Sequence, residues 1–577
     1  MAPRASRIRI LSRLAPAVVL AALVLGSPAA SGADALANDS NGRAILAVVA
    51  VDSYGDLKQQ LIWLGPHVDN PGLAGMLESL LLLSTQGKGL IGLDVKRPLG
   101  VIVTSEDGDI GVHGILPVKD LDKLLSSLQA VTGPVENDGE LRRLTLPSGQ
   151  DLEIREADGW AIIGQRDQQI DLADPAKYLN PLVKEFTLAV ETHPSLMPES
   201  LRALLAAGIE QMAAASANQG RPVDAQALRT ALDSLGAIDT LTLAMALDPK
   251  ANTVFLENRI VALNGPNVGS TSTPLTVATA ATTDGGLPAV AAHAVQPLTD
   301  AQARQLIAIL DGALPQGSDA MSRTVSTVVR SLIEAMAAAG GVDAALTVDT
   351  SVAGQLPLIT AGAHIDDGAK LERQLKELFG PNSTLPREVK AKFDTGKVGK
   401  ATLHTVTIDV SATPAAAIVG PAVELTLAVT PDYAFLLHGG DVAARLDGLL
   451  STTGKANTAV ADEEVPGATI ALALDRILAY AATMGAGPQA EAAAERAASL
   501  LETDKDSGSV QLSTKPIDRG IATRLTVGAG ALSALKAGAA AAAPAAMAPA
   551  AGAGGNGNGR RPAQRLPVER EPAGAGR

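Results

Sequence analysis

The sequence predicts an α+β protein built as two tandem repeats, each a mainly antiparallel β-sheet covered on one face by helices. Apolar residues make up 46% of the 577 residues and charged residues 19%, so the chain can bury substantial cores. Strand-like runs come mostly in pairs joined by short turns, which is typical of antiparallel hairpins. Groups of predicted helices lie between these hairpins. A similar series of elements occurs twice along the chain, which indicates a duplication.

The first segment, residues 1–33, has the three parts of a secretory signal peptide. Four arginines precede the apolar run LAPAVVLAALVLG, and small residues follow it in SPAASGADA. Ser31 and Ala33 fit a cleavage site after Ala33, with Ala35 as an alternative end. The apolar run is too short to span a bilayer comfortably, and retention as a membrane anchor is the alternative interpretation.

Composition divides the rest of the chain into four parts. We expect the first α+β repeat over residues 42–265 and the second over residues 287–538. Between them, residues 266–286 are rich in Ser, Thr and Gly, which is typical of a linker. The Ala/Pro/Gly tail over residues 539–577 lacks the apolar side chains that a core needs, so it is expected to be disordered.

Five pairs of segments indicate the duplication. Residues 44–65 and 287–310 each show an apolar strand followed by an amphipathic helix, and residues 99–128 and 343–381 each show a hairpin followed by a helix. Three further pairs continue in the same order: 142–165 with 401–440, 186–212 with 468–484, and 240–263 with 509–532. Five elements in one order are unlikely to recur by chance, so we expect one module copied in tandem.

Two acidic stretches could be cation sites or only turns. Glu106, Asp107 and Asp109 surround Gly108, but a calcium loop needs six to eight oxygens and a closing bidentate carboxylate. Residues 110–116 are expected to form a strand instead, and the corresponding TSVAG of the second half has no carboxylate, so a hairpin turn is predicted. DKDSGS at residues 504–509 is also predicted to be a turn, because Lys515 stands where a closing Glu would be needed.

Gly87, Gly89 and Gly92 have the spacing of a dinucleotide-binding loop. That motif needs a strand before it and a helix after it, whereas here the helical run LAGMLESLLLLST precedes the glycines. We therefore expect the end of a helix, where glycine is favoured.

The polar side chains do not form a recognisable catalytic or metal motif. The seven histidines are all too far apart in sequence for a local ligand pair, and core-edge or surface positions are expected: His67, His113, His193, His293, His364, His404 and His438. His113 is expected on the opposite face of its strand from Ile110 and Val112. The pair Asp366–Asp367 stands at a predicted helix start, and Glu463–Glu464 in a predicted loop. We find no GxSxG, P-loop or HExxH motif, so the sequence assigns no catalytic, cofactor-binding or metal-binding residue.

Composition narrows the possible partners. The formal net charge is −14, and an acidic surface repels phosphate backbones, which argues against nucleic acid and anionic membranes. Aromatic residues make up only 2%, so platforms for stacking bases or sugars are scarce. The absence of cysteine excludes disulfides and thiolate chemistry. A second long apolar run is not found, so no membrane span is expected in the mature chain.

The runs GLDVKRPLGVIV, GILPVKDLDKLL and EIREADGWAIIG resemble motifs of a group of exported bacterial proteins of unknown function. The resemblance covers the first half of the chain well and the second half weakly. It implies an α+β fold and export, and it carries no catalytic residue or ligand.

These observations lead to the hypothesis of an exported, non-enzymatic binding or scaffold protein of the cell envelope, periplasmic or extracellular, whose partner is a protein or an apolar ligand. A hydrolase with a site assembled from separated residues and an envelope carrier of a lipid-like ligand are the alternatives. An exposed apolar surface would favour partner binding, a deep aliphatic cavity the carrier, and clustered Asp, Glu, His or Ser residues the enzyme.

Overall fold

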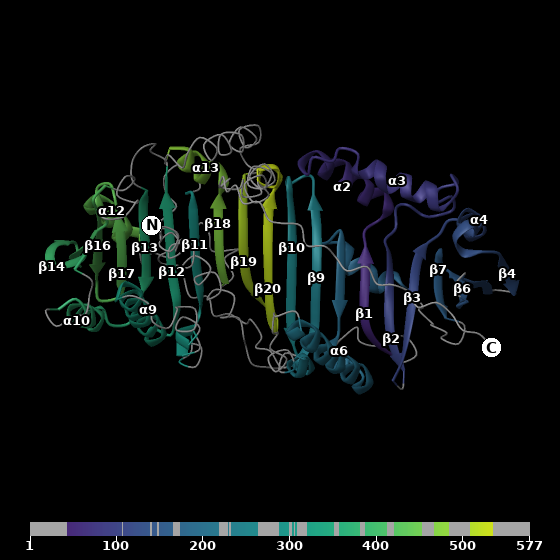
Figure 1. Cartoon of the computed structure of the whole chain (residues 1–577), viewed down its shortest axis with the longest axis horizontal. Coiled ribbons are helices and arrows are strands. Elements are labelled where there is room, and N and C mark those ends of the chain that lie inside the picture. Colours follow the sequence, from purple (N-terminus) through teal and green to yellow (C-terminus); the bar gives the residue numbers. More distant parts are fainter. Residues whose placement is uncertain are drawn as a thin grey trace, which may run out of the picture.

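In a computed structural model, the chain forms one antiparallel sheet of twenty strands with helices along its margins (Figure 1). The structure describes residues 43–534, apart from 107, 139–140, 147–148, 166–173, 219–228, 230–231, 264–287, parts of 299–319, 351–356, 381–386, 412–419, 453–466 and 484–507. The predicted signal peptide, the predicted linker, the predicted tail and the Glu463–Glu464 loop therefore lie outside the described residues, as does most of the predicted turn at 504–509.

The strands lie side by side from the edge at β4, through the first half of the chain, to the second half and the opposite edge at β14. From the first edge the order is β4 (Val135–Asp138), β5 (Leu141–Thr145), β6 (Asp151–Ala157), β7 (Trp160–Gln165), β3 (Asp109–Pro117), β2 (Leu99–Glu106), β1 (Ala44–Val51), β8 (Leu188–Thr192), β9 (Ile238–Asp248) and β10 (Thr253–Ala262). It continues with β20 (Gly520–Gly528), β19 (Ser509–Ile517), β18 (Gly467–Ala473), β11 (Val290–Pro297), β12 (Gly341–Asp349), β13 (Leu358–His364), β17 (Tyr433–His438), β16 (Ala422–Val429), β15 (Ala401–Asp409) and β14 (Val389–Val398).

The two series of ten strands follow one order. Read from the edge inward, the first is 4-5-6-7-3-2-1-8-9-10 and the second is 14-15-16-17-13-12-11-18-19-20. They meet where β10 pairs with β20 over nine residue pairs, from Thr253 opposite Gly528 to Val261 opposite Gly520. The α+β class and the antiparallel pairing are confirmed, but a single sheet runs through both halves instead of a separate sheet in each.

The helices lie mainly beyond the ends of the strands. At one end are α2 (Tyr54–His67), α3 (Leu73–Ser84), α4 (Leu121–Thr132), α12 (Val442–Thr452) and α13 (Leu474–Thr483) (Figure 1). At the other end are α6 (Glu199–Asn218), α9 (Ala320–Ala338) and α10 (Gly368–Leu378), while α5 (Ala176–Val183) packs behind β1 and β8. Two short 3-10 turns, Pro194–Leu196 and Leu235–Ala237, flank α6 and β9. No helix in the described part of the chain is long and apolar enough to cross a membrane.

Helices pack on both faces of the sheet, so the expectation of one covered face is wrong. Ala161 of β7 lies in a core with Leu124 of α4, whereas its neighbour Ile162 lies in a core with Leu179 of α5. Because successive residues of a strand point to opposite faces, α4 and α5 cover opposite sides. The face on which α4 packs is called the front face below, and the other the back face.

Of the two edge strands, β14 carries features that interrupt regular pairing. β4 pairs only with β5, and β14 only with β15. The exposed residues of β14 include Lys390, Lys392 and Lys397, and its register shifts between Lys392 and Gly396, where Asp394 has a φ of 55°. Charged side chains and a bulge are typical protection for a free edge.

Candidate functional site

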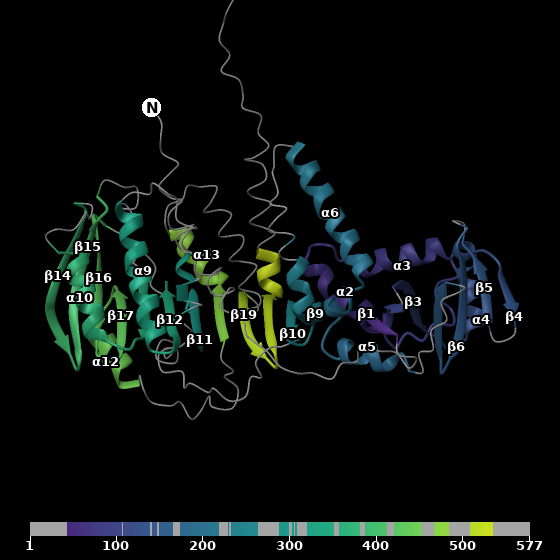
Figure 2. The same cartoon turned by 90° about the horizontal axis from the view of Figure 1, so that it is seen from below.

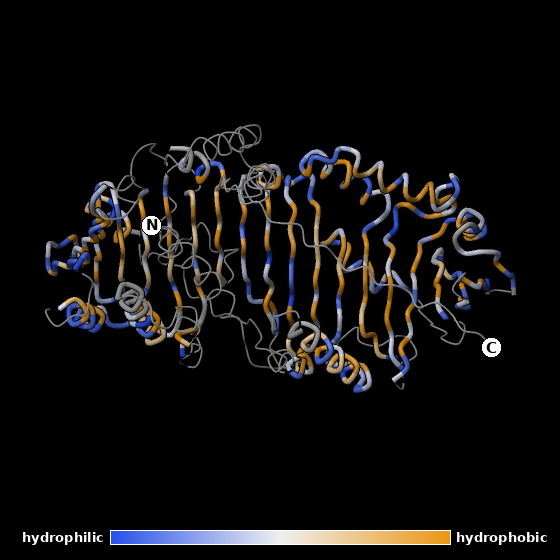
Figure 3. Tube along the Cα trace, viewed as in Figure 1, coloured by the Kyte–Doolittle hydropathy of each residue, from blue (hydrophilic) through white to orange (hydrophobic). Residues whose placement is uncertain are grey.

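The central strands present a continuous aliphatic row on the front face. Its members lie directly opposite one another on twelve successive strands, so they share one face. In spatial order they are Leu99, Val51, Leu188, Met245, Leu256, Leu525, Leu512, Ile470, Ala292, Leu346, Ala361 and Leu436. With neighbouring strands about 4.8 Å apart, the row is about 50 Å long. Figure 3 shows the apolar colouring of these strands.

This aliphatic row is open to solvent. Each member is at least partly exposed; Leu256 is 50% exposed, and Leu243, which neighbours the row on β9, is 54% exposed. An antiparallel sheet with one solvated face normally carries polar side chains on that face. An extended aliphatic surface is the kind of feature at which binding sites are found, so this one is the candidate site. We call this surface, the row together with Leu243, the open aliphatic face.

Helices border the open aliphatic face at both strand ends. Figure 2 shows α3, α6, α9 and α13 on one side of the sheet, and α5 on the other side. The helix α10 also packs on the front face. Its Leu371 and Leu375 share a core with Ala363 and Ala434, which lie on the same face of their strands as the row. The helices of the described part of the chain therefore frame the central strands at both ends.

One polar step interrupts the aliphatic surface at the junction of the two halves. Beside Leu243, the next residues across the sheet are Asn258 of β10, Thr523 of β20 and Thr514 of β19. The Asn258 Oδ1 is buried and has no hydrogen-bond partner in the described part of the chain. Thr514 is buried and its hydroxyl donates to Ala468 O at 3.4 Å, so the polar groups at the middle of the surface are the Asn258 amide and the Thr523 hydroxyl.

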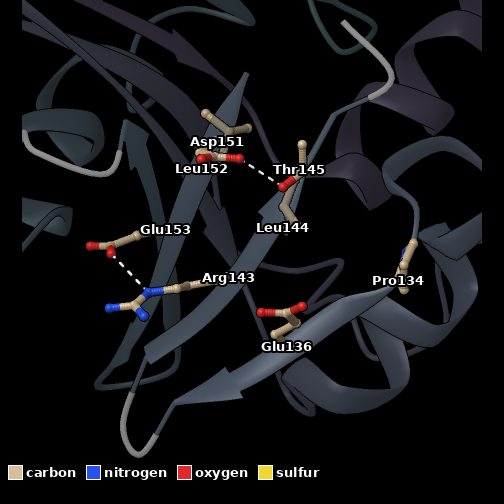
Figure 4. Close-up of a pocket in the computed structure, with 8 residues that line it drawn as sticks. All are labelled: Pro134, Glu136, Arg143, Leu144, Thr145, Asp151, Leu152 and Glu153. Atoms are coloured by element: carbon tan, nitrogen blue, oxygen red, sulfur yellow. Dashed lines mark hydrogen bonds and ion pairs between the residues drawn. The ribbon is translucent and has the colours of Figure 1, made fainter. Parts of the chain in front are cut away.

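Figure 4 shows a polar pocket at the far end of the sheet, over β5 and β6. Its volume is about 280 Å³, and it is lined by Pro134, Glu136, Arg143, Leu144, Thr145, Asp151, Leu152 and Glu153. Arg143 Nε lies 3.1 Å from Glu153 Oε1, and Thr145 Oγ1 donates to Asp151 Oδ1 at 2.7 Å. Arg143 and Glu153 therefore bond each other, as do Thr145 and Asp151, and the lining contains no histidine. The Thr145–Asp151 pair is exposed to water.

An apolar cavity under α4 is much smaller. Its volume is about 80 Å³, and leucines of α4 line it together with Ile154, Ala161 and Ile163. A single water occupies about 30 Å³ of liquid, so this space cannot hold an acyl chain. It is a packing gap in the core of the first half.

The most concentrated titratable cluster joins α10 to the edge strands. Glu372, Asp394 and His404 bring one ligand atom each to within 4.8 Å of one another. Lys376 already lies between the carboxylates, with its Nζ 2.6 Å from Glu372 Oε1 and 2.9 Å from Asp394 Oδ2. That side-chain hydrogen bond from Lys376 lowers the pKa of the Asp394 carboxyl. The lysine supplies the positive charge that a cation would otherwise bring.

The hydrogen bonding of His404 also disfavours a metal at this cluster. The Asp394 backbone N–H donates to His404 Nδ1 at 3.1 Å, so the proton of the neutral ring is on Nε2. Nε2 is buried without a hydrogen-bond partner in the described residues and lies 3.8 Å from Glu372 Oε1. A metal would need a bare nitrogen there, which the hydrogen bond at Nδ1 disfavours. Burial lowers the pKa of His404, which keeps the ring neutral. We assign the cluster a structural role, closing the β14 bulge over α10.

The structure places several histidines deeper than the sequence indicated. His113, His193, His404 and His438 are at most 6% exposed, so a surface position is wrong for these four. His113 does lie on the opposite face from Ile110 and Val112, as expected, but the histidine faces inward and the aliphatic residues are exposed. Thr104 Oγ1 lies 3.3 Å from His113 Nε2, yet both side chains are buried and closed to a substrate.

The two motifs that could suggest ion or nucleotide binding have structural positions. Glu106 pairs with Asp109 across the β2–β3 hairpin, and Gly108 has a φ of 93°, which confirms the predicted turn. The glycines at 87, 89 and 92 follow α3, which confirms the predicted helix end, and the Gly87 N–H donates to Leu82 O at 2.6 Å. Asp367 is the N-cap of α10, as its expected position at a helix start requires.

Sequence reasoning missed the open aliphatic face. In the segment LTLAMALD of β9, apolar residues point to both faces of the strand. This pattern was available in the sequence, but a strand of this kind is ordinarily taken to be buried on both faces. The strand pairing and the partial exposure of the row, and not the sequence pattern, show this surface. No protein-family model, curated protein or solved structure matches this chain.

Proposed function

We propose that this protein is a non-enzymatic binding protein that holds the acyl chain of a lipid on the open aliphatic face. The observation that carries the proposal is the unbroken aliphatic row across twelve strands, partly exposed at every position. Moving an acyl chain from water onto this surface is favourable in proportion to the apolar area that both sides bury. An exposed apolar surface is expected to favour a protein partner and a deep cavity a lipid carrier, so a lipid is proposed against that expectation, on the side-chain chemistry of the surface.

The chemistry of the surface favours an acyl chain over a protein partner. Protein interfaces concentrate their binding energy in Trp, Tyr and Arg, and the aliphatic row contains none of these. An acyl chain needs no directional partner along its length. The polar step at Asn258 and Thr523 could receive a single polar group of the ligand, such as an ester or a hydroxyl.

The proposal is tested by binding of a fluorescent fatty acid together with native mass spectrometry of the purified protein. Leu243→Asp and Leu256→Asp place a charge on the surface and should weaken fatty-acid binding by about tenfold or more each. Leu204→Asp on α6 is the matched control, because Leu204 is 68% exposed and lies outside the row. Equal binding by all four proteins, or no binding by the wild type, would overturn the proposal.

We also propose that the two halves arose by tandem duplication, over residues 42–265 and 287–538. The common strand order supports this, and so do the helix caps. Asp120 begins α4 and Asp367 begins α10, each after the corresponding hairpin, and each accepts from a backbone N–H three residues later, Lys123 at 3.0 Å and Lys370 at 2.8 Å. Separate expression of the two halves, followed by mixing, tests whether each folds and whether they assemble through β10 and β20.

Export to the cell envelope completes the proposal, with a periplasmic or extracellular location. It is supported by the basic, apolar and small-residue parts of residues 1–33. N-terminal sequencing of the mature protein tests it. A first residue between 34 and 36 is expected, and an intact Met1 in the mature protein would contradict cleavage.

A further inference from the structure

The helix α3 is apolar on two sides, and only one of them is used for packing. Leu73, Leu77 and Leu81 are partly buried, and Ala74 is buried. On the other side Met76, Leu80 and Leu83 form a stripe with helical spacing and are 55%, 63% and 79% exposed. A helix with one packed face normally turns polar residues to water, so this second stripe is unexplained by the fold.

Three further aliphatic residues, one on α3 and two on the segments that flank it in the chain, are also exposed. Leu82 is 47% exposed, Ile62 of the adjacent helix α2 is 47% exposed, and Ile91 after the glycine turn is 55% exposed. The only ionisable residue of α3 is Glu78, which forms an ion pair with Lys58 of α2. We call these six aliphatic residues the α3 patch: Ile62, Met76, Leu80, Leu82, Leu83 and Ile91.

We propose that the α3 patch inserts into the surface of a lipid bilayer. This rests on the proposed function, because a protein that carries an acyl chain must meet the membrane that supplies or receives it. The α3 helix lies on the same side of the sheet as the open aliphatic face, at its border (Figures 1 and 2). Insertion of α3 would therefore bring the membrane to the side on which the chain is held.

The composition of the α3 patch suits a bilayer better than another protein. All six side chains are aliphatic, and none is Trp, Tyr or Arg, the residues that anchor protein interfaces. The ion pair of Glu78 with Lys58 leaves no isolated charge to drag into the acyl region. The net charge of −14 disfavours an anionic surface, so the bilayer addressed is one of zwitterionic lipids.

Flotation of the full mature chain with phosphatidylcholine vesicles tests the proposal. The wild type should float with the vesicles, and the double variant Leu80→Asp/Leu83→Asp should lose at least tenfold in partition. These side chains are mostly exposed, so thermal unfolding should change little, which separates loss of binding from loss of fold. Leu204→Asp is the control, because α6 also projects on this side and Leu204 is 68% exposed but lies outside the α3 patch.

Two results would overturn the proposal. The first is equal flotation of the wild type and the double variant, or no flotation of either. The second is a wild-type dimer that the double variant converts to a monomer in light scattering, which would assign the α3 patch to a second copy of the chain. Fatty-acid binding measured without vesicles is independent of these outcomes: its absence would end the proposed function while leaving α3-dependent flotation in place.

Discussion

Asp239 and Arg519, 280 residues apart in the chain, form a buried ion pair with 3.1 Å between Asp239 Oδ2 and Arg519 Nη1. Asp239 stands in β9, and Arg519 is in the turn between β19 and β20 with a φ of 55°. A second ion pair, Glu257 of β10 with Arg524 of β20, lies at the same junction, and Glu257 is only 5% exposed. The two halves of the sheet are therefore joined by charge pairs as well as by backbone bonds.

Removing one charge of the first pair should destabilise the whole chain. In Asp239→Asn, Arg519 keeps a buried charge without its partner, and breaking a buried pair in this way costs about 3–5 kcal/mol. Urea unfolding measures the change. Asp122→Asn is the control, because the Asp122–Arg142 pair is exposed, with the aspartate 74% exposed, and should cost less than about 1 kcal/mol. Similar effects of the two variants would contradict a structural role for the buried pair.

Gly92 is required by the fold, whether or not the glycine-rich turn binds anything. Its φ is 95°, and a Cβ there would lie 2.3 Å from Asp120 O, at the start of α4. Gly108 has a similar φ of 93° but open space around it. Gly108→Ala should therefore cost only the backbone strain of about 1–2 kcal/mol, and Gly92→Ala clearly more. Thermal unfolding compares the two, and equal losses would mean that the contact with Asp120 is relaxed at no cost.

Stability should fall as the solution becomes mildly acidic. Burial lowers the pKa of His404 below its ordinary value of 6.5, although the nearby Glu372 and Asp394 oppose this and Lys376 adds to it. Burial also lowers the pKa of His293. The unfolded chain then binds protons that the folded chain does not, so the free energy of unfolding decreases as pH drops below 6.5.

The slope of that dependence is measurable by urea unfolding between about pH 7.5 and 5.5, where one such proton contributes up to about 1.4 kcal/mol per pH unit. His404→Asn keeps an acceptor for the Asp394 N–H and should reduce the slope, and His293→Asn should reduce it further. A slope unchanged in the double variant would show that other groups cause it.

The two faces of β9 should differ in how well they tolerate asparagine. Leu243 on the front face is 54% exposed, whereas its neighbour Ala244 is 8% exposed in the core with Phe186. Leu243→Asn should alter the free energy of unfolding by less than about 1 kcal/mol and raise solubility, while Ala244→Asn buries an amide and should cost about 2 kcal/mol or more. Comparable losses at both positions would mean that something covers Leu243 in solution.

The sequence predicted the local elements better than their assembly. The hairpin at Gly108, the end of α3 before Gly87 and the cap at Asp367 all follow from local turn and cap chemistry, which a few neighbouring residues determine. The pairing of β10 with β20 joins residues more than 250 positions apart, and no local rule specifies it. The open aliphatic face depends on that pairing, so it could not be predicted either.

The edge strand β14 bears on whether further chains can add to the sheet. β4 and β14 are the places where further strands could add, and β14 turns lysines and a register break outward. A twenty-strand plate with unprotected margins would be a template for fibre growth. We therefore expect the finite width of the sheet to depend in part on these residues, and neutralising Lys390, Lys392 and Lys397 together to promote edge-to-edge association at β14, measured by light scattering.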